Sequence, residues 1–242
     1  MIEALPGIVL RLAVVVLSLA VHEAAHGLVA RWLGDPTATR QGRVSLNPLR
    51  HLDLQGSVIV PGLLLVSQWL AGGQGGVIFG WAKPVPVDPR YFRNPFTGMA
   101  LVAAAGPASN LLLALAAAQL LEGAALAGFG WRDGPALLLA PVIIVNLALM
   151  IFNLIPLPPL DGSKMLWGPL FPFMPARFRH WYAGLTHAQR SFGPILLVVG
   201  LGLGWSLLGG RPWAWFNYLF GGLVFAAFQW LLVLTELSWS WL

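Results

Sequence analysis

Long apolar runs dominate the chain, and short polar or proline-rich stretches separate them. Five of these runs are continuous and long enough to cross a bilayer as helices, because about 20 apolar residues span a hydrocarbon core of about 30 Å. A sixth run is broken by Pro61 and Gly62 and by the sequence GGQGG, which favours a re-entrant segment. The continuous runs cover 8–33, 99–127, 136–154, 192–209 and 213–239, and the broken run covers 57–79.

Proline marks the stretches between these runs. Residues 80–95 (GWAKPVPVDPRYFRNP) alternate in character and predict a short β-ribbon. The run 136–154 continues into IPLPPLDG, whose three prolines must unwind a helix. Residues 162–190 are amphipathic and basic. No repeat or linker divides the chain, so we expect one membrane-embedded domain over 1–242.

Composition excludes the common soluble classes. The chain is 57% apolar and only 10% charged, whereas a soluble domain carries about 25% charged residues. An integral membrane protein in contact with the lipid bilayer is therefore expected, and a nucleic-acid partner is not, despite a net charge of +5. The chain has no cysteine, so a metal would need nitrogen and oxygen ligands.

The first apolar run contains the sequence HEAAH, formed around His22, Glu23 and His26. Residues four apart share one face of a helix, so both imidazoles can reach the same ion. Glu23 then lies where it can act as a general base, as in zinc metalloproteases. Such residues are costly in hydrocarbon and are seldom without function there.

A catalytic zinc needs a third protein ligand. Asp161 is the first candidate because it follows an apolar run directly, on backbone that proline unwinds. His51 and Asp53 come next, although a turn or cap role is favoured for both. His180 and His187 lie among arginines and are expected at the solvated interface.

The distribution of basic residues gives an independent prediction of topology. If 57–79 crosses the bilayer, the two sides hold 8 and 6 lysines and arginines; if it is re-entrant, they hold 11 and 3. The second division agrees better with the positive-inside rule. It also places His22, His26 and Asp161 at similar depth on the basic, cytoplasmic side.

Three blocks of sequence resemble the site-2 protease family of intramembrane zinc metalloproteases. They are HEAAHG (22–27), AGPASN (105–110) and NLIPLPPLDG (153–162), in the order that the family shows. The resemblance covers a catalytic core of about 8–175 and leaves additional helices over about 192–239. No stretch resembles a PDZ or CBS domain. This compact form looks prokaryotic, which implies a location in the cell (inner) membrane.

The resemblance implies a fold, a site and a reaction. The fold would be an all-α polytopic membrane protein with about five transmembrane helices, a re-entrant segment and short membrane-associated β-ribbons. His22, His26 and Asp161 would bind Zn²⁺, and Glu23 would be the base. Asn153 and Asn110 would bind the substrate, an unwound transmembrane protein segment that pairs with a β-ribbon at 39–46.

Other interpretations stay open at this point. AGPASN is equally well explained as a small-residue face for helix packing. The three metal-binding residues would also suit a protein that transports or senses a metal, although the remaining apolar runs offer no polar path. A catalytically inactive scaffold is a third possibility, and the presence of Glu23 argues against it.

Overall fold

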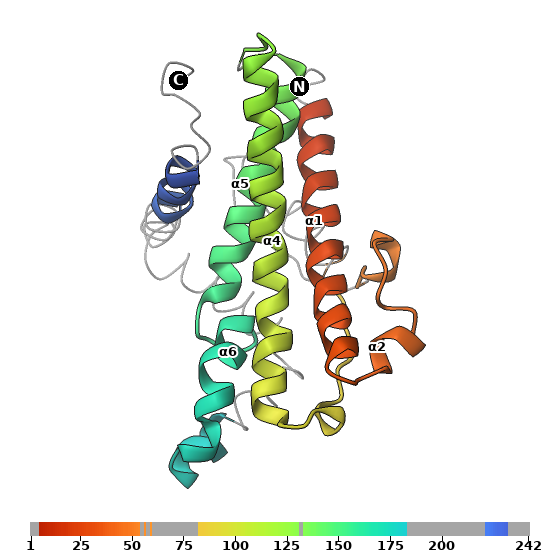
Figure 1. Ribbon diagram of the computed structural model, residues 1–242, viewed down its shortest axis with the longest axis vertical. Coiled ribbons are helices and arrows are strands. Elements are labelled where there is room, and N and C mark those ends of the chain that lie inside the picture. Colours follow the sequence, from red (N-terminus) through yellow and green to blue (C-terminus); the bar gives the residue numbers. More distant parts are fainter. Residues whose placement is uncertain are drawn as a thin grey trace.

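The computed structural model describes residues 5–53, 56, 59, 82–130, 133–182 and 221–231. Three of its helices are apolar and long enough to cross a membrane, and they stand side by side (Figure 1). These are α1 (Leu5–Trp32), α4 (Pro95–Leu126) and α5 (Gly134–Leu154). The shorter elements are α2 (Thr37–Arg40), η2 (Pro48–Arg50), η4 (Pro89–Tyr91), α6 (Asp161–Leu170) and η5 (Phe171–Phe173), with further helical residues at 176–182 and 221–231.

The predicted helical membrane protein is confirmed in part. The runs 8–33, 99–127 and 136–154 correspond to α1, α4 and α5. The segment 57–79, apart from residue 59, and all of 192–209 lie outside the described residues, as does most of 213–239. The total number of spans, the re-entrant segment and the single-domain organisation therefore stay predictions.

Local chemistry explains where the helices begin and end. The Asn94 side chain accepts hydrogen bonds from two backbone N–H groups at the start of α4, where Pro95 occupies the first helical position. Helix α1 ends at Trp32, and the φ of 104° at Gly34 permits the bond from Asp35 N–H to Ala30 O that closes a Schellman motif. Helix α5 ends before Pro156, because a proline disfavours helical backbone in the preceding residue.

The arrangement brings distant parts of the sequence to one end of the bundle. Helix α4 runs opposite to α1 and α5, so α6 lies at the end where α1 finishes and α4 begins (Figure 1). The residues on either side of 57–79 also meet, because a β-bridge joins Leu52 to Ala82.

Two apolar contact regions hold the helices together. The larger, which we call the apolar cluster, joins α4, α5 and the helix at 221–231. A smaller one packs Ala30 of α1 against Phe92 and Val102. The buried members of the apolar cluster are Ala114, Ala117, Ala118, Leu121, Ala136, Ile143, Leu147, Val224, Phe228 and Leu231.

The described residues form no strand at either predicted ribbon. In 39–46, the first two residues complete α2 and the rest is loop. In the described part of 80–95, a single antiparallel bridge joins Ala82 to Leu52. Pro84 and Pro86 lack the N–H groups that a ladder needs, so extended backbone there cannot pair regularly.

Candidate metal centre

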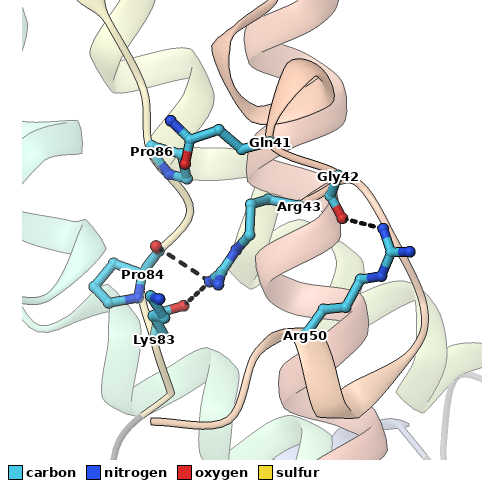
Figure 2. A pocket seen from close by; sticks show the side chains of 7 residues that line it. All are labelled: Gln41, Gly42, Arg43, Arg50, Lys83, Pro84 and Pro86. Atoms are coloured by element: carbon cyan, nitrogen blue, oxygen red, sulfur yellow. Dashed lines mark hydrogen bonds between the residues drawn. The ribbon is translucent and has the colours of Figure 1, made fainter.

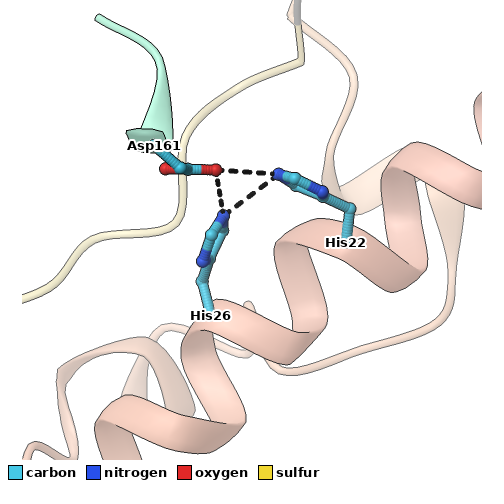
Figure 3. Close-up of side chains that lie close together, drawn as sticks. All are labelled: His22, His26 and Asp161. Atoms are coloured by element: carbon cyan, nitrogen blue, oxygen red, sulfur yellow. Dashed lines mark hydrogen bonds and ion pairs between the residues drawn. The ribbon is translucent and has the colours of Figure 1, made fainter. Parts of the chain in front are cut away.

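Three buried side chains converge between α1 and the first residue of α6. The Nε2 atoms of His22 and His26 lie 3.1 Å apart, and each lies 3.1 Å from Oδ2 of Asp161 (Figure 3). Each of the three residues is at most 8% exposed. They form a cluster of potential metal ligands within the described part of the chain.

The donor set fits a divalent metal ion. Around a tetrahedral zinc with bonds of about 2.0–2.1 Å, neighbouring ligand atoms lie about 3.3 Å apart. The observed separations of 3.1 Å are close to that value. Two imidazole nitrogens and one carboxylate oxygen are ligands that zinc accepts, and three protein ligands leave a fourth position open.

Each imidazole is oriented by the nitrogen that faces away from the cluster. His26 Nδ1 donates to the carbonyl oxygen of Val102 at 2.7 Å, and His22 Nδ1 donates to Asn110 Oδ1 at 2.7 Å. A proton on Nδ1 leaves the lone pair of Nε2 directed into the cluster. This is how oriented histidine ligands are usually supported in metalloproteins.

The support of His22 continues through a buried polar chain. Asn110 Nδ2 donates to Asn146 Oδ1 at 3.1 Å, and Asn146 Nδ2 donates to Ser18 Oγ at 2.9 Å. Asn110 and Asn146 are fully buried. We call the residues linked in this way the polar layer: Ser18, His22, His26, Asn110, Asn146 and Asp161.

Asp161 is held in its ionised form. Its Oδ1 accepts a hydrogen bond from Lys164 Nζ at 2.9 Å, which leaves Oδ2 facing the two histidines. Burial alone raises the pKa of the Asp161 carboxyl. Hydrogen bonding with His22 and His26, together with the charge of Lys164, outweighs burial and holds that pKa well below its ordinary value.

Two glycines make the close approach of the elements possible. A Cβ atom at Gly106 would lie 2.5 Å from His22 Nε2 and 2.6 Å from His26 Cε1. A Cβ atom at Gly162 would collide with backbone atoms of Leu154 and lie 2.7 Å from the carbonyl oxygen of Ile155. Gly106 therefore lets α4 pass beside the imidazoles, and Gly162 lets α6 start against the end of α5.

Glu23 lies on α1 beside the cluster and is partly exposed. Its Oε2 accepts a hydrogen bond from the backbone N–H of Val85 at 2.9 Å. Two buried charged residues fix the segment that contains Val85. Arg43 donates to the carbonyl oxygen of Lys83, and the fully buried Asp35 accepts from the N–H of Asp88 at 2.7 Å.

The remaining candidate residues lie elsewhere. Asn153 is in the last turn of α5, where its amide donates to Leu149 O at 3.0 Å. His51 is buried and its Nε2 donates to Ser45 O at 2.7 Å, and Asp53 accepts from Gly56 N–H at 2.8 Å. Both contacts are local, as expected of turn or cap residues.

Two further histidines, His180 and His187, were expected at the solvated interface. His180 is exposed, and its Nδ1 donates to the carbonyl oxygen of Ala176 at 2.9 Å, as expected for the interface. His187 lies outside the described residues.

Sequence reasoning missed two members of the polar layer, Ser18 and Asn146. The available signal was the presence of a hydroxyl and an amide within helices that are otherwise almost entirely apolar. Polar side chains inside a membrane helix face protein partners in most cases. The pairing of these two residues with Asn110 depends on how three helices pack, which the spacing along the chain does not specify.

A buried cluster of two histidines and one carboxylate that could hold a metal ion lies beside membrane-length helices, as in membrane-embedded metalloproteins. The chain is 37% identical to YwhC of Bacillus subtilis (strain 168) over 188 residues, which are 76% of each chain. It is 28% identical to Rip2 of Mycolicibacterium smegmatis over 159 residues, which are 64% of this chain and 55% of Rip2. Both relatives are named as putative zinc metalloproteases.

No family model and no solved structure matches the chain. On the similarity to YwhC, the chain belongs to the site-2 protease family.

Proposed function

We propose that this protein is an intramembrane zinc metalloprotease of the site-2 type. It hydrolyses peptide bonds in or near the transmembrane segments of other membrane proteins, as in regulated intramembrane proteolysis. The observation that carries the proposal is the convergence of His22, His26 and Asp161 at 3.1 Å, with Glu23 on the same helix. The names of the relatives support the same chemistry.

Each residue of the centre has a defined task in this proposal. His22, His26 and Asp161 hold Zn²⁺. Bound zinc supplies Lewis acidity that activates a water molecule and polarises the scissile carbonyl. Glu23 takes the proton of the attacking water and delivers it to the nitrogen of the leaving amine. The hydrogen bond from Val85 N–H keeps the Glu23 carboxylate in one orientation for both transfers.

The two asparagines receive different tasks. Asn110 is fully buried, and both ends of its amide are already engaged by His22 and Asn146. We therefore assign Asn110 to the orientation of His22 instead of to contact with substrate. Asn153 is partly exposed where α5 ends, and we propose that it holds the backbone of an unwound substrate segment.

The position of the metal centre toward one end of the helix bundle supports access of water. His22 and His26 lie in the C-terminal half of α1, at the end of the bundle where α6 begins (Figure 1). We propose that this end faces the cytoplasm in a prokaryotic inner membrane, because the basic residues of 31–50 and 83–93 gather there.

Replacement of Glu23 by Gln tests the proposal. The variant keeps the size of the side chain and removes the base, so purified protein should retain zinc but cleave a reconstituted transmembrane substrate at least about 1,000-fold more slowly. Zinc content and cleavage rate are measured on the same preparation. Full cleavage activity with Gln at this position would contradict the mechanism.

A further inference from the structure

A pocket separate from the metal centre lies between the loop that follows α2 and the segment that precedes η4. Its volume is about 450 Å³, within the range of about 300–1,000 Å³ typical of ligand sites. Figure 2 shows Arg43 extending across it, with Lys83 and Pro84 on one side and Gly42 and Arg50 on the other. The lining residues are Gln41, Gly42, Arg43, Arg50, Lys83, Pro84 and Pro86.

The pocket is strongly basic. Three of its lining residues are cationic and none is acidic. Among the residues that the structure describes, no carboxylate forms an ion pair with Arg43, Arg50 or Lys83. Uncompensated positive charge in a pocket of this size favours an anionic ligand.

Arg43 carries an unused hydrogen-bond donor. The residue is 8% exposed, and one of its terminal nitrogens donates to the carbonyl oxygens of Lys83 and Pro84 at 2.5 and 3.3 Å. Its Nε is buried and has no hydrogen-bond partner among the described residues. A buried donor without a partner is unfavourable, and a small rotation of the guanidinium toward an anionic oxygen in the pocket would satisfy it. Arg50 is exposed and donates to Gly42 O at 2.7 Å, so its remaining donors are available.

Exposed leucines lie on the same loop as Arg43 and Arg50. Leu46, Leu49 and Leu52 are 67%, 72% and 38% exposed. Cationic side chains beside exposed large apolar ones are typical of protein segments that lie in the headgroup region of a bilayer. The loop follows α2, a short helix that comes a few residues after the membrane-length helix α1, where the headgroup region is expected.

From these observations we infer that the pocket binds the phosphate of an anionic phospholipid, with Arg43, Arg50 and Lys83 around the headgroup and the three leucines among the acyl chains. The site shares no side chain with the metal centre, although Arg43 also fixes the segment that contains Val85, so the test substitutes Arg50 and Lys83 and leaves Arg43 in place. Inorganic phosphate has the same charge chemistry but no acyl chains, so it distinguishes a lipid site from a general phosphate site.

Native mass spectrometry of the full chain in detergent tests this inference with phosphatidylglycerol and phosphatidylcholine of the same acyl composition. Each basic residue near an anionic lipid contributes about 1 kcal/mol, or roughly fivefold in affinity. We expect phosphatidylglycerol to bind at least roughly fivefold more tightly than phosphatidylcholine, and Arg50→Gln or Lys83→Gln to remove about fivefold of that affinity. Leu49→Ser should weaken binding of both lipids.

Arg93→Gln is the matched control, because Arg93 is also exposed and basic in a neighbouring loop but does not line the pocket. Its phosphatidylglycerol affinity should equal that of the unmodified protein. Since Arg50, Lys83 and Arg93 are all exposed, the thermal unfolding midpoints of the variants should be unchanged. Equal losses in Arg50→Gln and Arg93→Gln, equal affinity for the two lipids, or complete displacement by millimolar inorganic phosphate would each overturn the lipid site.

Discussion

The same helices build two regions of opposite character. In the polar layer, α4 contributes Asn110 and α5 contributes Asn146, and both side chains are fully engaged in hydrogen bonds. One turn further along α4, Ala114 belongs to the apolar cluster, which has no polar side chain among its buried members. On α5, Ile143 and Leu147 of that cluster flank Asn146.

The contrast shows which region depends on exact partners. A buried polar group inside a membrane protein is costly unless it is paired, so removal of one partner in the polar layer leaves another unsatisfied. The apolar cluster depends on van der Waals packing, because lipid is as apolar as its side chains. Substitutions in the polar layer should therefore alter the metal centre, whereas those in the apolar cluster should alter stability alone.

Among substitutions that keep the three metal-binding residues and Glu23, the largest effect is expected from Gly106→Ala. The added methyl group would overlap the rings of both His22 and His26, which are hydrogen-bonded to Asn110 and Val102 on the same helix. We expect zinc affinity to fall at least about 100-fold, as the ligand atoms can no longer converge. Equilibrium dialysis against zinc buffers measures this change.

Gly123→Ala on the same helix is the matched control, because a Cβ there meets no atom within 4 Å. It should leave zinc affinity unchanged and stabilise α4 by up to about 1 kcal/mol. Equal zinc affinities for the two variants would show that α4 does not constrain the imidazoles.

Asn110→Ala should have the next largest effect. It removes the acceptor of His22 Nδ1 and leaves Asn146 Oδ1 without a donor. Loss of such an outer partner typically lowers metal affinity by about 10–100-fold. Asn153→Ala is the matched control, because the Asn153 amide donates to Leu149 O in its own helix. This variant should bind zinc normally. Indistinguishable zinc affinities would contradict the task assigned to Asn110.

Asp35→Asn tests the support of Glu23. The two carboxylate oxygens of Asp35 accept from the N–H groups of Thr37 and Asp88, so in either orientation the amide nitrogen of asparagine would face a backbone donor in a fully buried position. An unsatisfied buried group costs about 1–3 kcal/mol, and we expect roughly tenfold lower kcat with unchanged zinc content and substrate KM. Asp133→Asn, in the exposed loop before α5, is the control and should match the unmodified enzyme. A fall in zinc content for Asp35→Asn would refute a role limited to Glu23.

The smallest effect is expected from Ile143→Val in the apolar cluster. The substitution removes one methylene from a fully buried side chain and should cost about 0.5–1.5 kcal/mol. Thermal unfolding in detergent should detect this loss, while zinc affinity and cleavage stay unchanged. A change in zinc affinity here would remove the distinction between the two regions.

Much of the scaffold follows from the sequence for clear physical reasons. Long apolar runs can only form helices in a bilayer, and this predicted α1, α4 and α5. The i, i+4 spacing of His22 and His26 and the prolines before Asp161 indicated a common site, and the structure brings the three side chains together. Their roles as zinc ligands stay a prediction.

Other features depend on contacts that leave little trace in sequence. The bond from Val85 N–H to Glu23 uses backbone, so no side-chain motif announces it. The ribbon expected at 39–46 is absent, because Asp35 accepts from Thr37 N–H and the chain turns into α2. Asn110 appeared as a substrate-binding residue from family resemblance, and only the packing of α4 against α1 shows its contact with His22.

The most direct test of the metal centre is the zinc content per chain of purified protein, measured by atomic emission for the unmodified chain, Asp161→Ala and Asp53→Ala. Asp53 is the matched control, because it is also an aspartate that follows a proline-containing stretch. It lies outside the three-residue cluster. We expect about one zinc per chain in the unmodified protein and in Asp53→Ala, and almost none in Asp161→Ala. Zinc retained in full by Asp161→Ala would contradict the assignment of Asp161 as the third ligand.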